Sequence, residues 1–337
     1  MVGIGVIGYG YWGPNLVRNF FELKGSEVRM VSDLLPNRLK TVSLRYPSLK
    51  TSLNYRDVIK DPGVDAVVVA TPVFNHFEIG MEVLRSGKHL LLEKPLTLTS
   101  NESRRLIEEA RERKCILMVD HTFVYTGAVR KIKELVDSGD LGKLYYYDSV
   151  RVNLGLFQHD VNVLWDLAVH DLSIMDYVLG REVKAVSANG IAHLPGGTED
   201  VAYLTCFFED DLIAHFHVNW LAPVKVRRTL VGGDKKMIVY DDLEPSEKIK
   251  VYDKGVTLTG NTDSLHKVMV GYRTGDMWAP QLSGKEALLT EAEEFIGCIE
   301  TGRVPLTDGE AGLRVVKILE AAAKSVERQG VPVPLVV

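Results

Sequence analysis

The stretch Ile4-Gly5-Val6-Ile7-Gly8-Tyr9-Gly10-Tyr11-Trp12-Gly13 joins a short apolar run to three glycines spaced G-x-G-x-x-G. Residues 4–8 are typical of a buried strand and residues 13–23 of a helix. A glycine-rich turn between a strand and a helix lets the backbone approach a pyrophosphate, and it directs the positive end of the helix at that charge. The stretch therefore predicts a Rossmann fold that binds a dinucleotide. The turn residues expected at the cofactor are Gly8, Tyr9, Gly10, Tyr11, Trp12 and Gly13.

An acidic residue farther along the chain supports this interpretation. Asp33 follows a second predicted strand, residues 27–32, and lies 20 residues beyond Gly13. A carboxylate at this place accepts hydrogen bonds from the ribose hydroxyls and repels a 2′-phosphate. Asp33 therefore predicts that the cofactor is NAD in preference to NADP.

The pattern of strands and helices changes along the chain. Strands and helices alternate up to residue 120, as in a parallel sheet covered on both faces. From residue 143 to residue 253, short alternating runs separated by turn residues predict antiparallel hairpins. We expect an α/β plus α+β protein: a doubly wound Rossmann domain over residues 1–122, and a substrate-binding and oligomerisation domain over residues 123–337, built on a large, mostly antiparallel sheet. In the second domain, strands are expected at 144–153, 183–191, 201–208, 213–220, 227–231, 237–241 and 249–253, and helices at 166–179, 285–300 and 308–329.

Composition and charge exclude several classes of function. The 337 residues are 46% apolar and 25% charged, with a net charge of -5 and no basic stripe, so nucleic-acid binding is not expected. No apolar run approaches the ~20 residues that span a bilayer, and the chain starts on a strand instead of a secretion leader. Cys115, Cys206 and Cys298 lack metal-binding spacing and are expected as buried thiols. These features predict a cytoplasmic protein.

The third strand of the predicted parallel sheet, residues 65–70, ends in a polar loop. Thr71 and Pro72 follow it directly, and Asn75 and His76 come shortly after. Ligands of an open α/β sheet bind beyond the carboxyl ends of the strands, so this loop is expected to border the cofactor. The alternative is an ordinary proline turn followed by a helix that Asn75 caps.

The next strand ends in Glu93-Lys94-Pro95 at the same edge of the sheet. This position directs Lys94 at the nicotinamide end of the cofactor, with Glu93 beside it. The alternative is a solvated lysine next to its own glutamate, which is the commonest arrangement of such a pair.

A second chemical motif is Asp166-x-x-x-His170, at the start of a predicted helix. The i, i+4 spacing places both side chains on one face. One interpretation is an acidic residue that complements the helix dipole beside an ordinary histidine. The other is a base oriented by a carboxylate, as alcohol oxidation requires, because hydride leaves a carbinol only as its hydroxyl proton is removed. Lys94 would then stabilise the developing alkoxide, which makes Lys94, Asp166 and His170 the candidate catalytic residues.

Three histidine–aspartate neighbours raise the question of a metal site. They are Asp120-His121, His159-Asp160 and His170-Asp171. Their spacing is not that of a zinc motif, and alcohol oxidation by NAD needs no metal, so none is expected.

Taken together, the chain resembles the Gfo/Idh/MocA oxidoreductases over nearly its whole length. The resemblance rests on the glycine-rich turn, on Glu93-Lys94-Pro95 and on Asp166-x-x-x-His170-Asp171. It implies a bound NAD(P), a substrate that is a sugar, polyol or sugar nucleotide, and Lys94, Asp166 and His170 around the reacting carbinol. Trp165 is expected near the cofactor on the same basis.

The residues before the aspartate suggest one branch of that family. Asp160 to Trp165 replaces a glycine-rich segment of many members, and Asn153-Leu154-Gly155 and Tyr272-Arg273 flank it in sequence. This variant is similar to the UDP-N-acetylglucosamine and UDP-N-acetylglucosaminuronate 3-dehydrogenases, which implies oxidation at C3 of a UDP-N-acetylhexosamine. The side chains expected at the substrate are Lys94, Arg151, Asn153, Asp166, His170 and Tyr272.

Several alternatives stay open at this point. The chain is expected to be an NAD-dependent dehydrogenase, but an inositol, polyol or simple-sugar dehydrogenase, a 3-keto-sugar reductase and a non-enzymatic NAD-binding regulator also fit the sequence. Lys94 and His170 both qualify as the group that takes the proton. A strand such as residues 201–208 is apolar on both faces, so a homodimer or homotetramer through the second sheet is expected. A monomer results if residues 285–300 and 308–329 cover that sheet instead.

Overall fold

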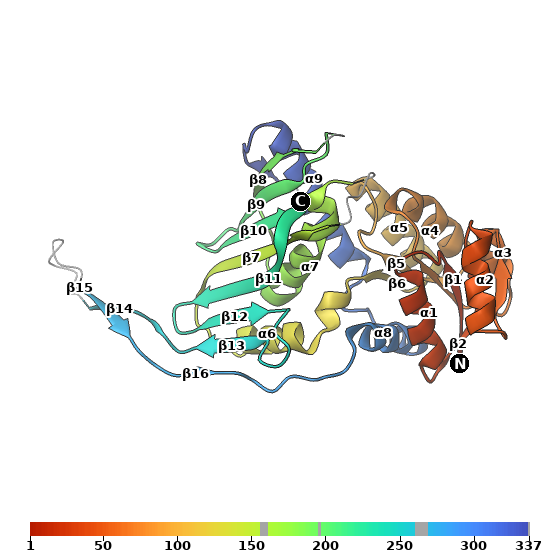
Figure 1. Ribbon diagram of the computed structural model, residues 1–337, viewed down its shortest axis with the longest axis horizontal. Helices are drawn as coiled ribbons and strands as arrows, with labels where there is room; N and C mark the ends of the chain where they lie inside the picture. The colour runs from red at the N-terminus through yellow and green to blue at the C-terminus, as the bar shows by residue number, and fades with distance from the viewer. Residues whose placement is uncertain (156–160, 195–196, 260–268, 336–337) are drawn as a thin grey trace. The chain divides into compact units, whose positions relative to one another are not determined.

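The computed structural model describes residues 1–155, 161–194, 197–259 and 269–335, with only the backbone for residues 256–259 and 269–272. The chain forms two compact units (Figure 1). The first unit combines Met1–Thr126 with Lys285–Glu320, and the second combines Gly127–Gly284 with Ala321–Val337.

The first unit is built on a six-stranded sheet in the order β3-β2-β1-β4-β5-β6, in which all neighbours are parallel. Its central strands are almost wholly apolar and buried, as expected for strands covered on both faces. Figure 1 shows helices on both faces of this sheet. The strands are β1 (Val2–Ile7), β2 (Ser26–Ser32), β3 (Lys50–Ser52), β4 (Ala66–Val69), β5 (His89–Glu93) and β6 (Leu117–Asp120).

Helices cover the sheet and connect its strands with parallel crossovers. The helices are α1 (Gly13–Glu22), α2 (Pro36–Arg45), α3 (Tyr55–Lys60), α4 (His76–Arg85), α5 (Ser100–Arg113) and α8 (Ala287–Thr301), with short turns η1 (Val73–Asn75) and η2 (Thr122–Tyr125). Helix α8 comes late in the sequence, yet Phe295 packs edge-on against Phe20 of α1. Thr307 then bonds the carbonyl of Val119 at 2.7 Å, so the returning segment lies beside β6.

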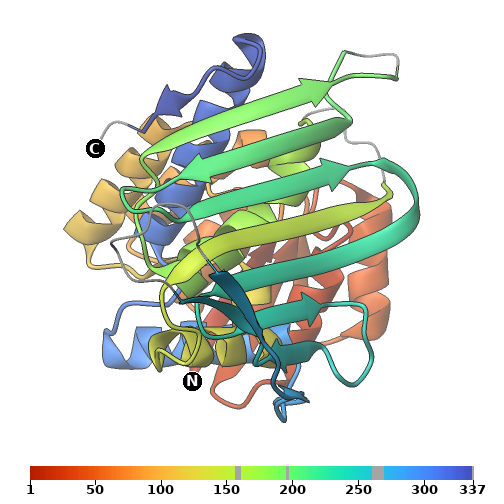
Figure 2. The same cartoon turned by 90° about the vertical axis from the view of Figure 1, so that its left-hand side faces the viewer.

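The second unit contains a nine-stranded sheet in the order β16-β13-β12-β11-β7-β10-β9-β8-β17, antiparallel except for the parallel pair β7–β10. Figure 2 presents the face of this sheet that carries no helix of its own unit, while α7 lies on the far side. Its strands are β7 (Leu144–Leu154), β8 (Ala185–Ile191), β9 (Val201–Phe207), β10 (Ile213–Asn219), β11 (Leu221–Gly233), β12 (Met237–Asp241), β13 (Ile249–Tyr252), β16 (Met277–Trp278) and β17 (Val333–Pro334). The remaining elements are α6 (Gly127–Asp137), η3 (Leu164–Ala168), α7 (Val169–Leu179), and β14 (Gly255–Thr259) paired with β15 (Met269–Arg273). Helix α9 (Gly309–Glu327) contributes to both units.

The two fold types predicted from the sequence are present, and the details differ in two respects. Residues 285–320 belong to the first unit, whereas the sequence assigned all of 123–337 to one second domain. The helix predicted at 166–179 starts as a π-helical segment, η3, and only α7 is regular. Backbone periodicity cannot show either feature, because the first depends on long-range contacts and the second on one extra residue in a turn.

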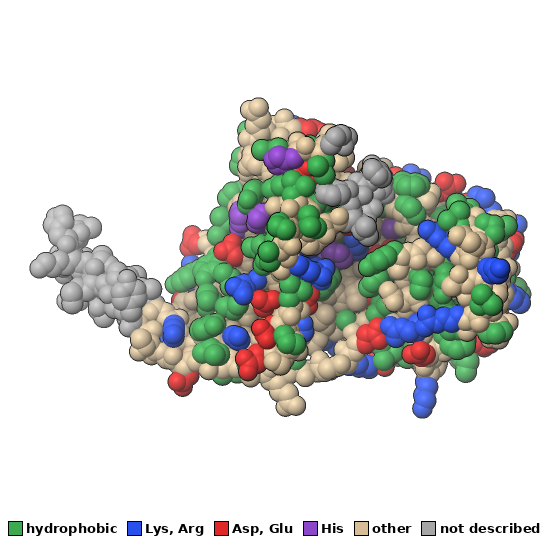
Figure 3. Space-filling view, in the orientation of Figure 1, with side chains coloured by type: hydrophobic (Ala, Val, Ile, Leu, Met, Phe, Trp, Pro, Cys, Tyr) green, Lys and Arg blue, Asp and Glu red, His purple; other side chains and the backbone are tan. Residues whose placement is uncertain are grey.

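The surface carries charged side chains of both signs. On the face shown in Figure 3, basic and acidic side chains lie interspersed over the surface. Within the described ranges, no helix is long and apolar enough to cross a membrane. Cys206 and Cys298 are buried thiols, whereas Cys115, expected to be buried as well, is partly exposed.

Candidate active site

The glycine-rich turn has the shape that a pyrophosphate requires. Gly8 has φ +98°, and a Cβ there would lie 2.4 Å from the carbonyl oxygen of Ala70. A Cβ on Gly13 would lie 2.3 Å from the carbonyl oxygen of Gly8. Both glycines are therefore needed for the tight turn and for close packing of α1 on β1. The Cα of Gly10 is open, with the Arg38 guanidinium 3.6 Å from a Cβ built there, so the backbone can approach a phosphate and the turn fits NAD.

Asp33 lies just after β2, next to this turn, and is 7% exposed. Its carboxylate accepts hydrogen bonds from the backbone N–H groups of Tyr9 (2.7 Å) and Leu35 (2.8 Å). These two bonds fix the carboxylate against the glycine-rich turn. Arg38 forms an ion pair with Asp33 at 3.2 Å. The guanidinium that could bind a 2′-phosphate is therefore already engaged by the carboxylate. Sequence reasoning did not find Arg38.

The loop after β4 differs in part from what the sequence predicts. His76 is fully buried, its two ring nitrogens face the backbone carbonyls of Thr71 (2.9 Å) and Pro95 (3.0 Å), and burial lowers its pKa. The imidazole therefore ties two loops together, and the expectation that it contacts the cofactor needs this correction. Asn75 makes no capping bond, whereas the buried hydroxyl of Thr71 has no hydrogen-bond partner among the described residues. An orphaned hydroxyl beyond a strand of this sheet suits a ligand contact.

The neighbourhood of Lys94 contains three carboxyl groups. Glu93 and Asp120 end β5 and β6 and lie opposite each other in the sheet register, and Glu291 joins them from α8. Asp120 accepts a hydrogen bond from the Trp12 indole N–H (2.9 Å) and another from the Thr122 hydroxyl. Burial, followed by the charge of Asp120, raises the pKa of both Glu93 and Glu291 well above the usual range. Burial of this carboxyl cluster therefore favours the protonated forms of Glu93 and Glu291.

The Glu93 carboxyl belongs to this buried cluster instead of being a free, solvated partner of Lys94. The Lys94 N–H donates to the Glu93 carboxyl at 3.0 Å, and the Lys94–Pro95 peptide bond is cis. His121, directly after Asp120, is 2% exposed; burial and then the Lys94 charge lower its pKa to about 3. A neutral His121 and carboxyl groups with raised pKa values are therefore the electrostatic neighbours of Lys94.

In the second unit, Asp166 lies in η3 and His170 in the first turn of α7. The Asp166 carboxylate accepts a hydrogen bond from the indole N–H of buried Trp220 at 3.0 Å. Asn162 accepts hydrogen bonds from the N–H groups of Leu164 and Trp165 at 3.1 and 3.2 Å and so caps the start of η3. A π-helical segment here matches the frequent occurrence of such segments at functional sites.

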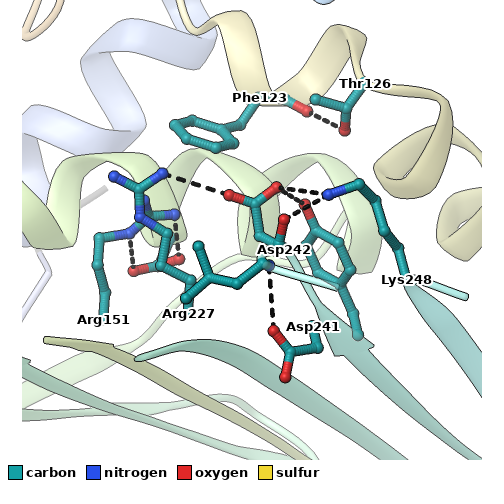
Figure 4. Close-up of polar contacts among 10 residues, drawn as sticks. Phe123, Thr126, Arg151, Arg227, Asp241, Asp242 and Lys248 are labelled. Carbon is teal, nitrogen blue, oxygen red and sulfur yellow. Dashed lines mark hydrogen bonds and ion pairs between the residues drawn. The ribbon is translucent and has the colours of Figure 1, made fainter. Parts of the chain in front are cut away.

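A second carboxylate, Asp171, follows His170 directly and is buried. Arg151 of β7 donates two hydrogen bonds to it, from Nε (2.8 Å) and Nη2 (2.9 Å). The guanidinium of Arg151, expected at the substrate, is 3% exposed and engaged by the Asp171 carboxylate. Figure 4 shows Arg151 with Asp242 and the two cations directed at that residue, Arg227 and Lys248.

The other predicted residues have fewer defined contacts. Trp165 and Asn153 are half-buried, in η3 and β7 respectively. Tyr272 belongs to β15, and its side chain lies outside the described residues, as do His159 and Asp160 entirely. Among the side chains that the structure places, no group of three His, Cys, Asp or Glu is arranged to hold a metal ion.

Four participants in these networks escaped sequence reasoning as site residues: Asp120, Asp171, Trp220 and Glu291. Asp120 carried a signal, because it ends a strand next to the one that Glu93 ends. Glu291 carried another, since it lies on the apolar face of its helix with Leu288 and Phe295. Asp171 belonged to the motif that carries the family resemblance, but its partner Arg151 is distant in sequence; Trp220 carried no signal, because its partner Asp166 is distant as well.

A parallel Rossmann sheet with this glycine-rich turn, together with a lysine and a carboxylate–histidine motif, defines a nicotinamide-dependent oxidoreductase. A model of the GFO/IDH/MocA oxidoreductase family, described as an NAD-binding Rossmann fold, matches residues 2–121, and a model of the GFO/IDH/MocA C-terminal domain matches residues 129–239. The chain belongs to the GFO/IDH/MocA family of NAD-dependent oxidoreductases.

Characterised relatives are distant but cover much of the chain. A scyllo-inositol 2-dehydrogenase (NAD(+)) of Bacillus subtilis is 26% identical over 99% of this chain and 95% of its own length. A UDP-N-acetylglucosamine 3-dehydrogenase of Acidithiobacillus ferrooxidans is 28% identical over 75% of this chain and 76% of its own. The solved structure of the latter superposes with a TM-score of 0.83 at 25% identity, covering 97% of this chain and 99% of that one.

Proposed function

We propose that the chain transfers a hydride between NAD and a secondary alcohol of a sugar nucleotide, at C3 of a UDP-N-acetylhexosamine. The observation that carries the proposal is the coexistence of a turn that fits NAD with Lys94 beyond β5 and with His170 beside the anchored Asp166. The resemblance to UDP-N-acetylglucosamine 3-dehydrogenase supports the choice of substrate.

In this proposal NAD supplies the hydride acceptor, and the chain's own residues handle the proton. His170 removes the proton of the reacting hydroxyl, and the ammonium of Lys94 stabilises the oxygen as negative charge develops. In this proposal Asp166, held by Trp220, orients His170. The same groups serve the reverse reaction, so direction depends on the supply of substrate and cofactor.

A second candidate function is the oxidation of a cyclic polyol. The similarity to scyllo-inositol 2-dehydrogenase extends over 99% of this chain, more than the sugar-nucleotide relative covers in sequence. Inositols and pyranoses both present secondary alcohols on a six-membered ring. The same catalytic groups can therefore serve either substrate.

A substrate panel separates these functions. Formation of NADH is measured with UDP-N-acetylglucosamine, UDP-N-acetylglucosaminuronate, scyllo- and myo-inositol and free hexoses. We expect the highest kcat/KM with a UDP-N-acetylhexosamine. A preference for an inositol selects the second candidate, and no NADH with any compound supports a non-enzymatic NAD-binding regulator.

We also propose that the chain forms a homodimer or homotetramer through the second sheet. The face without helices carries Tyr203, 45% exposed, and Ile213, 42% exposed, on neighbouring strands. The Tyr203 ring stacks on His217, with centroids 4.5 Å apart. Such an apolar and aromatic area is usually covered by a second copy in a two-fold arrangement.

Light scattering tests the assembly at micromolar concentration. We expect a multiple of the 37.5 kDa chain mass, reduced when Tyr203→Glu places a charge in the stacked area. A mass near 37.5 kDa for the unmodified chain contradicts the proposal.

A further inference from the structure

The second unit contains a buried ion pair between Arg151 and Asp171. The guanidinium meets the carboxylate with two parallel hydrogen bonds, and the two side chains are 3% and 4% exposed. Two-point contacts of this kind fix the orientation of both groups as well as their distance. Arg151 is on β7 and Asp171 on α7, so the pair fixes the first turn of α7 against the sheet.

Two anchored carboxylates, Asp166 and Asp171, lie within four residues of His170 in the chain. On one side, Asp166 is held by Trp220 at 3.0 Å. On the other, Asp171 follows His170 in the chain and is held by Arg151. The His170 carbonyl accepts a hydrogen bond from the Ser173 hydroxyl at 2.8 Å. The backbone around His170 is thus fixed from both directions.

Each charged group around the ion pair has an oppositely charged partner. Tyr147 of β7, Tyr240 of β12 and Asp242 act electrostatically on Arg151 or Asp171. Asp242 is itself held by Arg227 at 3.3 Å and by Lys248 at 3.7 Å (Figure 4). Arg151 is therefore the counter-charge of Asp171, while Asp242 has its own cations.

We propose that Arg151 is a positioning residue for His170, acting through Asp171. It fixes the turn that carries the imidazole, and it cancels a carboxylate charge that would otherwise act on that imidazole. The inference rests on the proposed function, in which His170 is the base. A direct contact between Arg151 and substrate is the competing role, and the buried, two-point ion pair argues against it.

Two single substitutions should shift the pH profile in opposite directions. In Arg151→Met the released charge of Asp171 favours the imidazolium, so the acid limb of kcat/KM for alcohol oxidation moves to higher pH. In Asp171→Asn the unbalanced Arg151 favours the neutral imidazole, so the limb moves to lower pH. A shift of about half a pH unit is expected for a charge at this range in a partly screened interior.

The double variant Arg151→Met/Asp171→Asn leaves the net charge unchanged and removes the paired hydrogen bonds that fix α7 to β7. Its acid limb should return to the wild-type position, with kcat lowered about tenfold by imperfect orientation. Arg151→Lys keeps the charge and loses the two-point geometry, so its limb should also stay in place. Arg228→Met, which breaks an exposed ion pair with Asp241 on a neighbouring strand, is the matched control and should change neither quantity.

Circular dichroism and NAD affinity establish that each variant is folded. If the single variants do not fold, the double variant decides: an unshifted limb with lowered kcat supports the inference, and wild-type kcat overturns it. Superimposable profiles, or a change confined to KM as expected of a substrate contact, also overturn it. The variant His170→Ala distinguishes failure of this inference from failure of the proposed function. If it keeps wild-type turnover, the proposed function fails as well. If it is inactive and the Arg151 and Asp171 profiles do not move, only this inference fails.

Discussion

Both units bury acidic side chains beside a proposed catalytic group, and they neutralise these acids by different means. In the first unit, burial and the neighbouring Asp120 raise the pKa values of Glu93 and Glu291 beside Lys94, which favours their protonated forms. In the second unit, Asp171 next to His170 is neutralised by a buried arginine. A carboxyl cluster stabilised by protons loses them as the pH rises, whereas an ion pair between a carboxylate and a guanidinium is indifferent to pH across the neutral range. The surroundings of Lys94 and those of His170 therefore respond differently to the same change in pH.

The largest expected effect comes from removing either of the two proposed catalytic groups. His170→Ala should lower kcat about 100- to 10,000-fold, because it removes the general base, and Lys94→Ala should act similarly through the alkoxide. The affinity for NAD should stay within a few-fold in His170→Ala. Steady-state kinetics with the preferred substrate and fluorescence titration with NADH measure both quantities. Lys40→Ala, at an exposed site of α2, is the control for Lys94. Near-normal turnover of either variant would remove that residue from the mechanism.

The next largest effect is expected on the preference for NAD over NADP, which depends on the ion pair between Asp33 and Arg38 in the first unit. Asp33→Ala removes the carboxylate and leaves Arg38 to meet a 2′-phosphate. We expect the ratio of NADP to NAD affinity to rise at least about tenfold, which corresponds to one charged hydrogen bond. Adding Arg38→Ala to this variant should abolish the gain. Equal affinities of the unmodified chain for NAD and NADP would contradict the role given to Asp33.

Much of the first unit could be predicted from sequence, because its signals are local. The glycine spacing, the apolar strands and Asp33 all lie within one βαβ unit, and the turn geometry at Gly8 and Gly13 follows from their type. The carboxyl cluster could be predicted in part. Glu93 and Asp120 end neighbouring strands, whereas Glu291 arrives on a helix almost two hundred positions later.

The second unit could be predicted only in outline. Its alternating strands indicate an antiparallel sheet, yet the strand order and the pairing of Arg151 with Asp171 depend on contacts between distant segments. Arg151 was expected at a substrate because an arginine in a strand gives no sign of its partner. His76 was expected at the cofactor for the same reason, since its two carbonyl partners are set by tertiary structure.

A smaller effect is expected on thermal stability. The pH dependence of Tm distinguishes a buried protonated carboxyl from a carboxylate in an ion pair. The folded-state pKa of Glu291 is raised, chiefly by burial, so its contribution to stability is fully present below its unfolded pKa and is lost as the pH rises toward the folded value. Glu291→Gln mimics the protonated side chain and should raise Tm by a few degrees at neutral pH, more at pH ~8 than at pH ~5. Glu293→Gln, at a partly exposed, ion-paired site of the same helix, should show no such trend. A Tm difference that is constant with pH would contradict the assignment.

Infrared spectroscopy of the folded chain at neutral pH can distinguish protonated carboxylic acids, expected in the first unit, from the ionised carboxylate of an ion pair, expected at Asp171. A protonated carboxylic acid has a carbonyl stretching band that an ionised carboxylate lacks. The account predicts such a band in the unmodified chain, weakened in Glu291→Gln and unchanged in Glu293→Gln and Asp171→Asn. Absence of the band, or a band that survives Glu291→Gln and disappears in Asp171→Asn, would contradict the account.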